Sequence, residues 1–226
     1  MMQQIPLTLP LPPSYDETSF VLGPANQHAC DWLAKWPDWP LPYKALNIFG
    51  PSGSGKTHLS CLWQGRHEAV LLRGLSQFDE EQFDDGHHVL LDDFGQPDRY
   101  DDTALFHLFN HISSRSGTLL ILSQQPVAHY QSSLSDLSSR LRSVAAQEIY
   151  LPDDQLLRDV LAKHFADKQC AVTAQVLDYI VNRMERSFAA AQKIAADIDE
   201  LALARKTPVN LSIARQVLDR HEPKLI

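Results

Sequence analysis

The chain has 226 residues, of which 44% are hydrophobic and 21% are charged, fractions that are typical of globular domains and exclude disordered and fibrous proteins. Lys and Arg number 20 against 28 Asp and Glu, and the resulting net charge of -8 disfavours a protein that wraps directly around DNA. The sequence has neither a run of about 18 apolar residues nor the pattern of a signal peptide. We therefore expect a soluble, cytoplasmic protein that does not enter a membrane.

Residues 1–15 carry four prolines, at positions 6, 10, 12 and 13, which predict an extended tail. A helix is expected over Gln27 to Trp36. Residues 16–152 then alternate short apolar runs with longer polar or helical stretches, and this alternation predicts an α/β domain with a parallel sheet buried on both faces. The five expected strands are Ala45 to Phe49, Ala69 to Arg73, Val89 to Asp92, Thr118 to Ser123 and Glu148 to Leu151.

Residues 153–226 show only helical periodicity. Apolar residues recur three or four positions apart from Leu157 to Phe165 and from Val176 to Met184, and again from Phe188 to Leu201. Asp153 and Thr173 stand where N-caps are expected, and a last helix is expected over Ser212 to Asp219. The second domain is therefore predicted to be an all-helical bundle.

The most specific motif lies between the first strand and a helical run. A phosphate loop needs glycines so that main-chain N–H groups can surround a triphosphate, a lysine for the outer phosphates, and a hydroxyl for magnesium. All required positions are present, so we expect nucleotide binding rather than a chance glycine-rich turn. The motif is Gly50, Pro51, Ser52, Gly53, Ser54, Gly55, Lys56 and Thr57.

Two acids end the third predicted strand. Asp92 is expected to hold Mg²⁺ together with Thr57, and Asp93 to orient the water that attacks the outer phosphate. Ser123, at the end of the fourth strand, is a candidate sensor of that phosphate. The alternatives are a solvated turn for the two acids and a serine that only begins a loop.

Several segments together resemble the DnaA-type branch of the AAA+ ATPases. They are Phe20 to Asn26, which resembles the entry motif, the phosphate loop with His58 and Leu59, Leu105 to Asn110 after the magnesium strand, and Leu137 to Leu141. The resemblance implies a P-loop core with a parallel five-stranded sheet and a helical lid, binding ADP or ATP with Mg²⁺. It also implies that His58 lies at the nucleotide and that Arg140 is an arginine finger, with Arg142 as the other candidate.

The sequence departs from that family at two points. The initiators continue into a helix-turn-helix domain that reads DNA, and we expect this protein to lack one. The family's nucleotide-sensing arginine is followed by an apolar residue, a glutamate and a glycine, whereas Arg186 here is followed by Ser187, Phe188, Ala189 and Ala190. Arg186 is the sensor candidate, and a solvated charge is the alternative.

A short DnaA-like chain of this kind resembles the Hda group of regulatory homologues. Their hallmark is a tail peptide that binds the polymerase sliding clamp, and Gln4, Ile5, Leu7 and Leu9 fit its pattern. A proline-stiffened peptide loses little entropy on docking, and its apolar side chains can fill a groove. The alternative is a tail that packs on its own domain.

The resemblance implies a regulator that binds the clamp, stimulates hydrolysis of ATP on the DnaA initiator, and has weak or no ATPase activity alone. A second hypothesis is a helicase loader or initiator-like ATPase that acts on DNA or a helicase, and a third is a nucleotide-binding scaffold. The sequence leaves open the resident nucleotide and whether the protein associates with itself.

Overall fold

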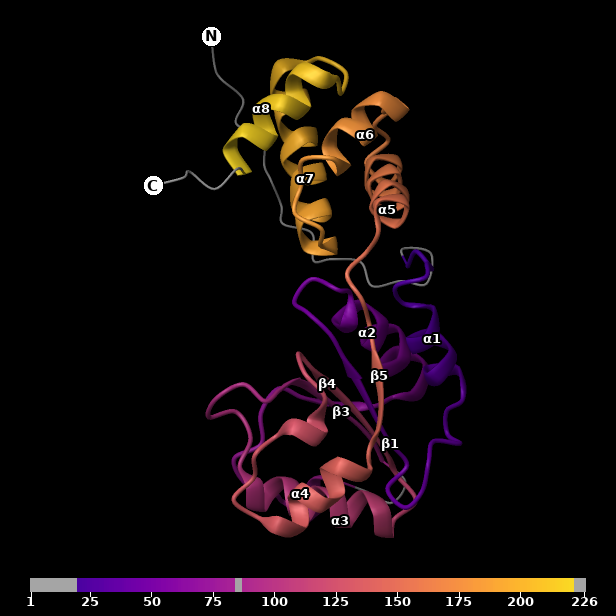
Figure 1. Cartoon of the computed structure of the whole chain (residues 1–226), viewed down its shortest axis with the longest axis vertical. Coiled ribbons are helices and arrows are strands. Elements are labelled where there is room, and N and C mark those ends of the chain that lie inside the picture. Colours follow the sequence, from indigo (N-terminus) through magenta and orange to yellow (C-terminus); the bar gives the residue numbers. More distant parts are fainter. Residues whose placement is uncertain (1–19, 84–86, 222–226) are drawn as a thin grey trace.

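A computed structural model describes residues 20–83 and 87–221, which form an α/β part and a helical part joined by a single connection after the last strand (Figure 1). Within these ranges no helix is long and apolar enough to cross a lipid bilayer.

The α/β part contains one five-stranded sheet in which every neighbouring pair is parallel. The strand order is β2-β3-β4-β1-β5, which confirms the predicted sheet. Because all strands run the same way, their carboxyl ends meet at one edge, where ligands bind in such folds. The strands are β1 (Ala45–Phe49), β2 (Val70–Leu72), β3 (His88–Phe94), β4 (Thr118–Ser123) and β5 (Ala145–Glu148).

The prediction for the fifth strand was wrong. It was expected over Glu148 to Leu151, but β5 ends at Glu148. This edge strand pairs only with β1 and has the short, weakly apolar sequence AAQE, whereas the more apolar residues that follow it lead to the helical part. Of those residues Ile149 is buried, and its N–H donates to the main-chain oxygen of Phe49 at 2.8 Å.

Helices cover both faces of the sheet (Figure 1). On β4, Leu119 and Ile121 face one side while Leu120 and Leu122 face the other. The first pair packs with α3 (Asp102–Ser114) and α4 (Ser135–Ser143), and the second with α1 (Gln27–Ala34) and α2 (Lys56–His67). The short 3-10 helices η2 (Glu80–Gln82) and η3 (Val127–His129) complete this part.

Four helices make the lid, and its core consists of the periodic apolar residues that the sequence indicated. The Asp153 carboxylate accepts from the N–H of Leu156 at 2.8 Å, which confirms that cap. Thr173 stands at the N-cap position of α6 but makes no side-chain capping bond within the described chain. The helices are α5 (Asp154–Asp167), α6 (Ala174–Val181), α7 (Phe188–Arg205) and α8 (Leu211–His221).

Asn47, in the middle of β1, is a polar residue with no exposed surface. Its amide nitrogen donates to the main-chain oxygen of Ile121 at 3.0 Å and to the Ser123 hydroxyl at 2.9 Å, and its oxygen accepts from the N–H of Val127 at 3.0 Å. One side chain therefore joins β1, the end of β4 and η3. These bonds fix the carboxyl edge of the sheet next to the phosphate loop.

Replacing Asn47 by alanine is expected to lower the free energy of unfolding by about 2 to 4 kcal/mol, because buried main-chain partners lose their hydrogen bonds. Urea denaturation followed by circular dichroism measures this loss. Asn182→Ala, at an exposed position after α6, is the matched control and should change stability little. Equal stability of the two variants would contradict the structural role of Asn47.

Candidate nucleotide-binding site

The phosphate loop connects β1 to α2, and the lid lies directly against it. Gly53 and Gly55 have φ angles of +76° and +89°, which residues other than glycine rarely adopt. A Cβ on Gly53 would lie 2.7 Å from the Cβ of Ser187, and one on Gly55 would lie 3.2 Å from the Phe188 ring. Both glycines are therefore required by the loop's conformation and by the close approach of the lid.

Lys56 opens α2 and is held inside the loop. Its ammonium donates to the main-chain oxygens of Gly50 at 2.7 Å and Pro51 at 2.8 Å. Burial lowers the pKa of Lys56, and the nearby charges of Asp92 and Asp93 oppose this shift. An ammonium has three N–H donors, so one remains for a phosphate oxygen. Thr57 follows in the first turn of the helix and is exposed.

The two consecutive acids near the end of β3 form a β-bulge. Leu91 pairs with Ile121 and Phe94 with Ser123, so both Asp92 and Asp93 stand opposite the single residue Leu122. Asp93 has a φ of +55°. The side chain of Asp92 is 11% exposed and that of Asp93 is 55% exposed. The bulge thus leaves one carboxylate shielded within the site and turns the other toward solvent.

The surroundings of Asp92 bear on its predicted role as a magnesium ligand. Burial and the charge of Asp93 raise the pKa of Asp92 above its usual value. The Asp93 N–H, Arg73 and Lys56 oppose this shift without cancelling it. The Arg73 Nε lies 3.8 Å from the Asp92 carboxylate. In the described ranges no cluster of three or more His, Cys, Asp or Glu side chains could hold a metal alone. Mg²⁺ usually binds one or two protein ligands together with substrate phosphates, so Asp92 and Thr57 fit such an ion.

The side chains of Asp93 and Ser123 are already engaged. The Arg99 guanidinium lies 3.2 Å from the Asp93 carboxylate. The Ser123 hydroxyl donates to the main-chain oxygen of Gln125 at 2.6 Å and accepts from Asn47. Ser123 touches the phosphate loop through its main-chain oxygen, which accepts from the Gly50 N–H at 3.2 Å. A role for either side chain at the outer phosphate therefore remains a prediction.

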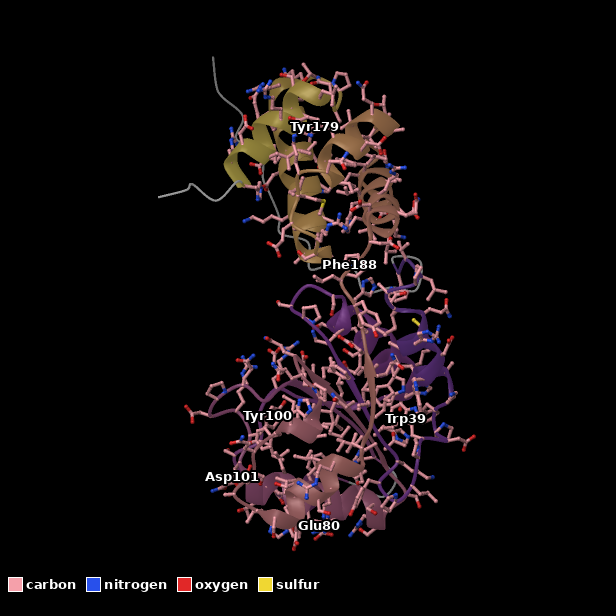
Figure 2. The ribbon with its side chains drawn as sticks, in the orientation of Figure 1. Trp39, Glu80, Tyr100, Asp101, Tyr179 and Phe188 are labelled. Atoms are coloured by element: carbon pink, nitrogen blue, oxygen red, sulfur yellow. The ribbon has the colours of Figure 1, made fainter. Side chains whose placement is uncertain are left out.

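The lid contacts the loop through the start of α7, at the junction of the two parts (Figure 2). The Phe188 N–H donates to the main-chain oxygen of Gly53 at 2.9 Å, and the Ser187 hydroxyl caps the helix by accepting from the Ala190 N–H. Arg186 precedes α7 instead of lying on a helix, and it pairs with Asp154 at 2.9 Å. The contact of Ser187 and Phe188 with the loop was not predicted from the sequence; a serine just before a helical run is the signal that indicates such a cap.

The segment from Phe20 to Asn26 links the loop helix to the lid. The Phe20 ring meets His58 of α2 edge-on, with centroids 5.4 Å apart. Gly23 lies against Leu156 of α5, and the main-chain oxygen of Ala25 accepts from the N–H of Tyr150. The predicted entry motif and His58 are thus brought next to the connection that leads to the lid.

Arg140 lies on α4, at the end of the α/β part away from the lid (Figure 1). Its guanidinium stacks on Phe106 at 4.2 Å, lies 5.6 Å from the Tyr43 ring, and donates to the Asn110 amide oxygen. Arg142 is exposed. The clamp-peptide residues Gln4, Ile5, Leu7 and Leu9 lie outside the described residues.

Comparison with known proteins identifies relatives along nearly the whole chain, although no protein-family model matches it. The chain is 24% identical over 234 residues to the chromosomal replication initiator protein DnaA of Clavibacter sepedonicus, covering 92% of this chain and 49% of the relative. For DnaA of Campylobacter fetus the identity is 25%, with 92% and 53% covered. The chain is similar in sequence to DnaA and spans about half the length of the curated relatives that it matches.

Solved structures show the same fold. Domain III of the Thermotoga maritima initiator DnaA superposes with a TM-score of 0.73 and 20% identity, covering 95% of this chain and all of that one. A DnaA bound to AMPPCP and single-stranded DNA superposes with a TM-score of 0.66 and 16% identity, and the match covers 87% of this chain and 69% of that one. The Thermotoga maritima RuvB branch-migration motor superposes with a TM-score of 0.61 and 13% identity, and the match covers 78% of this chain and 61% of that one. The chain therefore has the fold of domain III of DnaA.

Lys56→Ala is expected to weaken ADP binding by roughly 10- to 150-fold, because a hydrogen bond from an ammonium to a phosphate is worth about 1.5–3 kcal/mol. Isothermal titration calorimetry with ADP and Mg²⁺ measures the change. Lys193→Ala, at an exposed position on α7, is the control and should bind as the parent does. An unchanged affinity of Lys56→Ala for ADP would contradict the assignment of this loop as the nucleotide-binding site.

Proposed function

We propose that this protein is a DnaA-related AAA+ regulator of replication initiation, which binds an adenine nucleotide and the sliding clamp and stimulates hydrolysis of ATP on the DnaA initiator. The observation that carries the proposal is the placement of its two functional elements. The phosphate loop faces the lid, whereas Arg140 lies at the opposite end of the α/β part (Figure 1). In a head-to-tail contact between different surfaces, such an arginine serves the nucleotide of a neighbouring molecule.

The nucleotide is the element that holds the lid in place. The loop and α7 touch through Gly53 and Phe188, so an ADP or ATP that orders the loop also orders the start of α7. The likeness to a DnaA that carries AMPPCP supports an adenine nucleotide. Asp92 and Thr57 would hold Mg²⁺, whose charge neutralises the phosphates. Arg186 directly precedes Ser187, which lies against Gly53 of the loop, and it pairs with Asp154; it is the proposed sensor.

Weak hydrolysis by the protein alone follows from the state of Asp93. A carboxylate that orients an attacking water must be free to accept its protons, but Asp93 is paired with Arg99 and turned toward solvent. The donor of the Ser123 hydroxyl is likewise used within the domain. These contacts of Asp93 and Ser123 favour a protein that binds a nucleotide without hydrolysing it quickly, while hydrolysis takes place on its partner.

Arg140 would act on charge that develops in the transition state. An arginine supplied from a neighbouring molecule is worth roughly 10³ to 10⁵ in the rate of phosphoryl transfer. Such a gain converts slow hydrolysis into a switch and leaves the initiator in its ADP form. The tail residues Gln4, Ile5, Leu7 and Leu9 would tether the protein to the clamp, and this part of the proposal rests on the sequence.

The second candidate function is a helicase loader or initiator-like ATPase that acts on DNA. The likeness to a DnaA bound to single-stranded DNA favours it, whereas the net charge of -8 opposes it. Binding to single-stranded DNA that weakens steeply with salt would support this candidate, because each contacted phosphate releases counterions.

Arg140→Ala is expected to lower the maximal rate of initiator ATP hydrolysis by about 10³-fold while the protein still binds ADP, since the lost contact is made in the transition state. The assay combines the protein with DnaA, ATP and clamp-loaded DNA and measures released phosphate. Arg142→Ala, two residues away on the same helix, is the matched control. If Arg140→Ala stimulates as well as the parent, the regulator loses its proposed arginine.

Gln4→Ala combined with Leu7→Ala is expected to abolish binding to the clamp without changing the melting temperature. The proposal places these side chains against the partner, so their removal costs contacts there and no burial in the core. Surface plasmon resonance on immobilised clamp and differential scanning fluorimetry test both statements. Gln3→Ala with Thr8→Ala is the matched control in the same segment. A drop of several degrees in melting temperature would instead indicate that the tail packs on its own domain.

A further inference from the structure

One stripe of α3 carries three side chains that all contact the segment bearing Arg140. Asp102, Phe106 and Asn110 are spaced four residues apart, so they lie on the same side of the helix. The Asp102 carboxylate meets the residues that lead into α4, and Phe106 and Asn110 meet the Arg140 guanidinium within that helix. None of the three belongs to the nucleotide site.

Asp102 accepts four hydrogen bonds from the chain between η3 and α4. One carboxylate oxygen accepts from the Tyr130 hydroxyl at 3.1 Å. The other accepts from the Ser132 hydroxyl at 2.8 Å, the Ser133 N–H at 2.7 Å and the Ser133 hydroxyl at 2.8 Å. Burial raises the pKa of Asp102, but the bonds from Ser132, Ser133 and Tyr130 outweigh it and lower the pKa below its usual value. The carboxylate is therefore held in its charged, acceptor-only form.

The start of α4 depends on these bonds. In the described chain α4 begins without a side-chain cap from its N-cap residue, Leu134. The Leu134 N–H instead donates to the Ser132 hydroxyl at 3.0 Å, and that hydroxyl donates to Asp102. Asp102 thus orders the residues directly before α4 and sets where that helix begins relative to α3.

At the other end of the stripe, the side chain of Arg140 is restrained. The guanidinium stacks on Phe106 and donates through Nη1 to Asn110, which leaves its remaining N–H donors for another acceptor. A free arginine side chain loses about 2 kcal/mol of rotamer entropy when it is ordered. The stripe removes part of that freedom before any partner arrives, which is how preorganisation increases a rate.

We propose that Asp102, Phe106 and Asn110 are positioning residues for Arg140: Asp102 fixes the backbone that carries the arginine, and Phe106 and Asn110 fix its guanidinium. The inference rests on the proposed function, because positioning matters only if Arg140 acts on a neighbouring nucleotide. It assigns a positioning function to one side of α3.

The sharpest test replaces Asp102 by asparagine. The amide keeps one acceptor oxygen, but its nitrogen cannot accept, so the donors of Ser132 and Ser133 lose their shared partner. Asp101→Asn is the matched control, since it removes the same charge one position earlier and asparagine still caps α3 (Figure 2). Asn110→Ala and Phe106→Leu remove the two contacts to the guanidinium while leaving α4's start intact.

Initiator ATP hydrolysis is measured at increasing concentrations of each variant, with calorimetry to record its affinity for ADP. We expect Asp102→Asn and Asn110→Ala to lower the maximal rate about tenfold, because small displacements of a catalytic group cost this much or more. The concentration for half-maximal stimulation and the ADP affinity should change less than about twofold. Asp101→Asn should match the parent, and Phe106→Leu should lower the rate as Asn110→Ala does.

Arg140→Ala in the same series separates the two proposals. If it abolishes stimulation while Asp102→Asn, Asn110→Ala and Phe106→Leu remain as active as Asp101→Asn, the positioning inference is overturned and the proposed function stands. A change in half-maximal concentration alone also overturns it, since the stripe would then only contact the partner. If Arg140→Ala is fully active, both the positioning inference and the assignment of Arg140 as the arginine finger fail. Should Asp102→Asn not fold, the variants of Asn110 and Phe106 decide.

Discussion

The parallel direction of the five strands is the constraint on which the candidate site depends. Because β1, β3 and β4 end at the same edge, the phosphate loop, the two acids near the end of β3 and Ser123 come together although they are far apart in sequence. Asn47 reinforces this arrangement by bonding across β1 and β4 to η3. Leu46, Ile48, Leu120 and Leu122 pack between the sheet and α1 and α2, so the edge is held by a rigid core.

A single inserted residue in β3 differentiates the two acids. Without the bulge, neighbouring residues of a strand would simply alternate between faces. With it, Asp93 takes a left-handed conformation and meets Arg99, while Asp92 stays shielded with Arg73 and Lys56 nearby. Backbone strain of this kind is tolerated where surrounding contacts enforce it. Here the surrounding contacts include the Tyr100 hydroxyl, which donates to the main-chain oxygen of Asp92 at 2.5 Å.

The sequence predicted those features that depend on local pattern. The phosphate loop, the buried strands β1 and β4 and the helical lid carry strong signals, because glycine spacing and apolar periodicity are written in consecutive residues. The edge strand β5 was misplaced because its sequence is less apolar than the connection after it. The ion pair of Arg186 with Asp154 and the engagement of Ser123 by Asn47 and Gln125 join residues from different elements, and no local pattern reveals them.

Helix α3 lies beside α4, at the end of the α/β part away from the lid (Figure 1). It begins just after Tyr100, which bonds to the carbonyl of the proposed magnesium ligand, and its stripe then reaches Arg140. A displacement of Asp92 on binding Mg²⁺ would therefore act on Tyr100, which immediately precedes Asp101, the N-cap of α3. Packed helices transmit such shifts as rigid bodies, since a dense core deforms little. Under the proposed function, this helix connects the nucleotide site with Arg140, so binding at the first site would bear on the arginine offered to a neighbour.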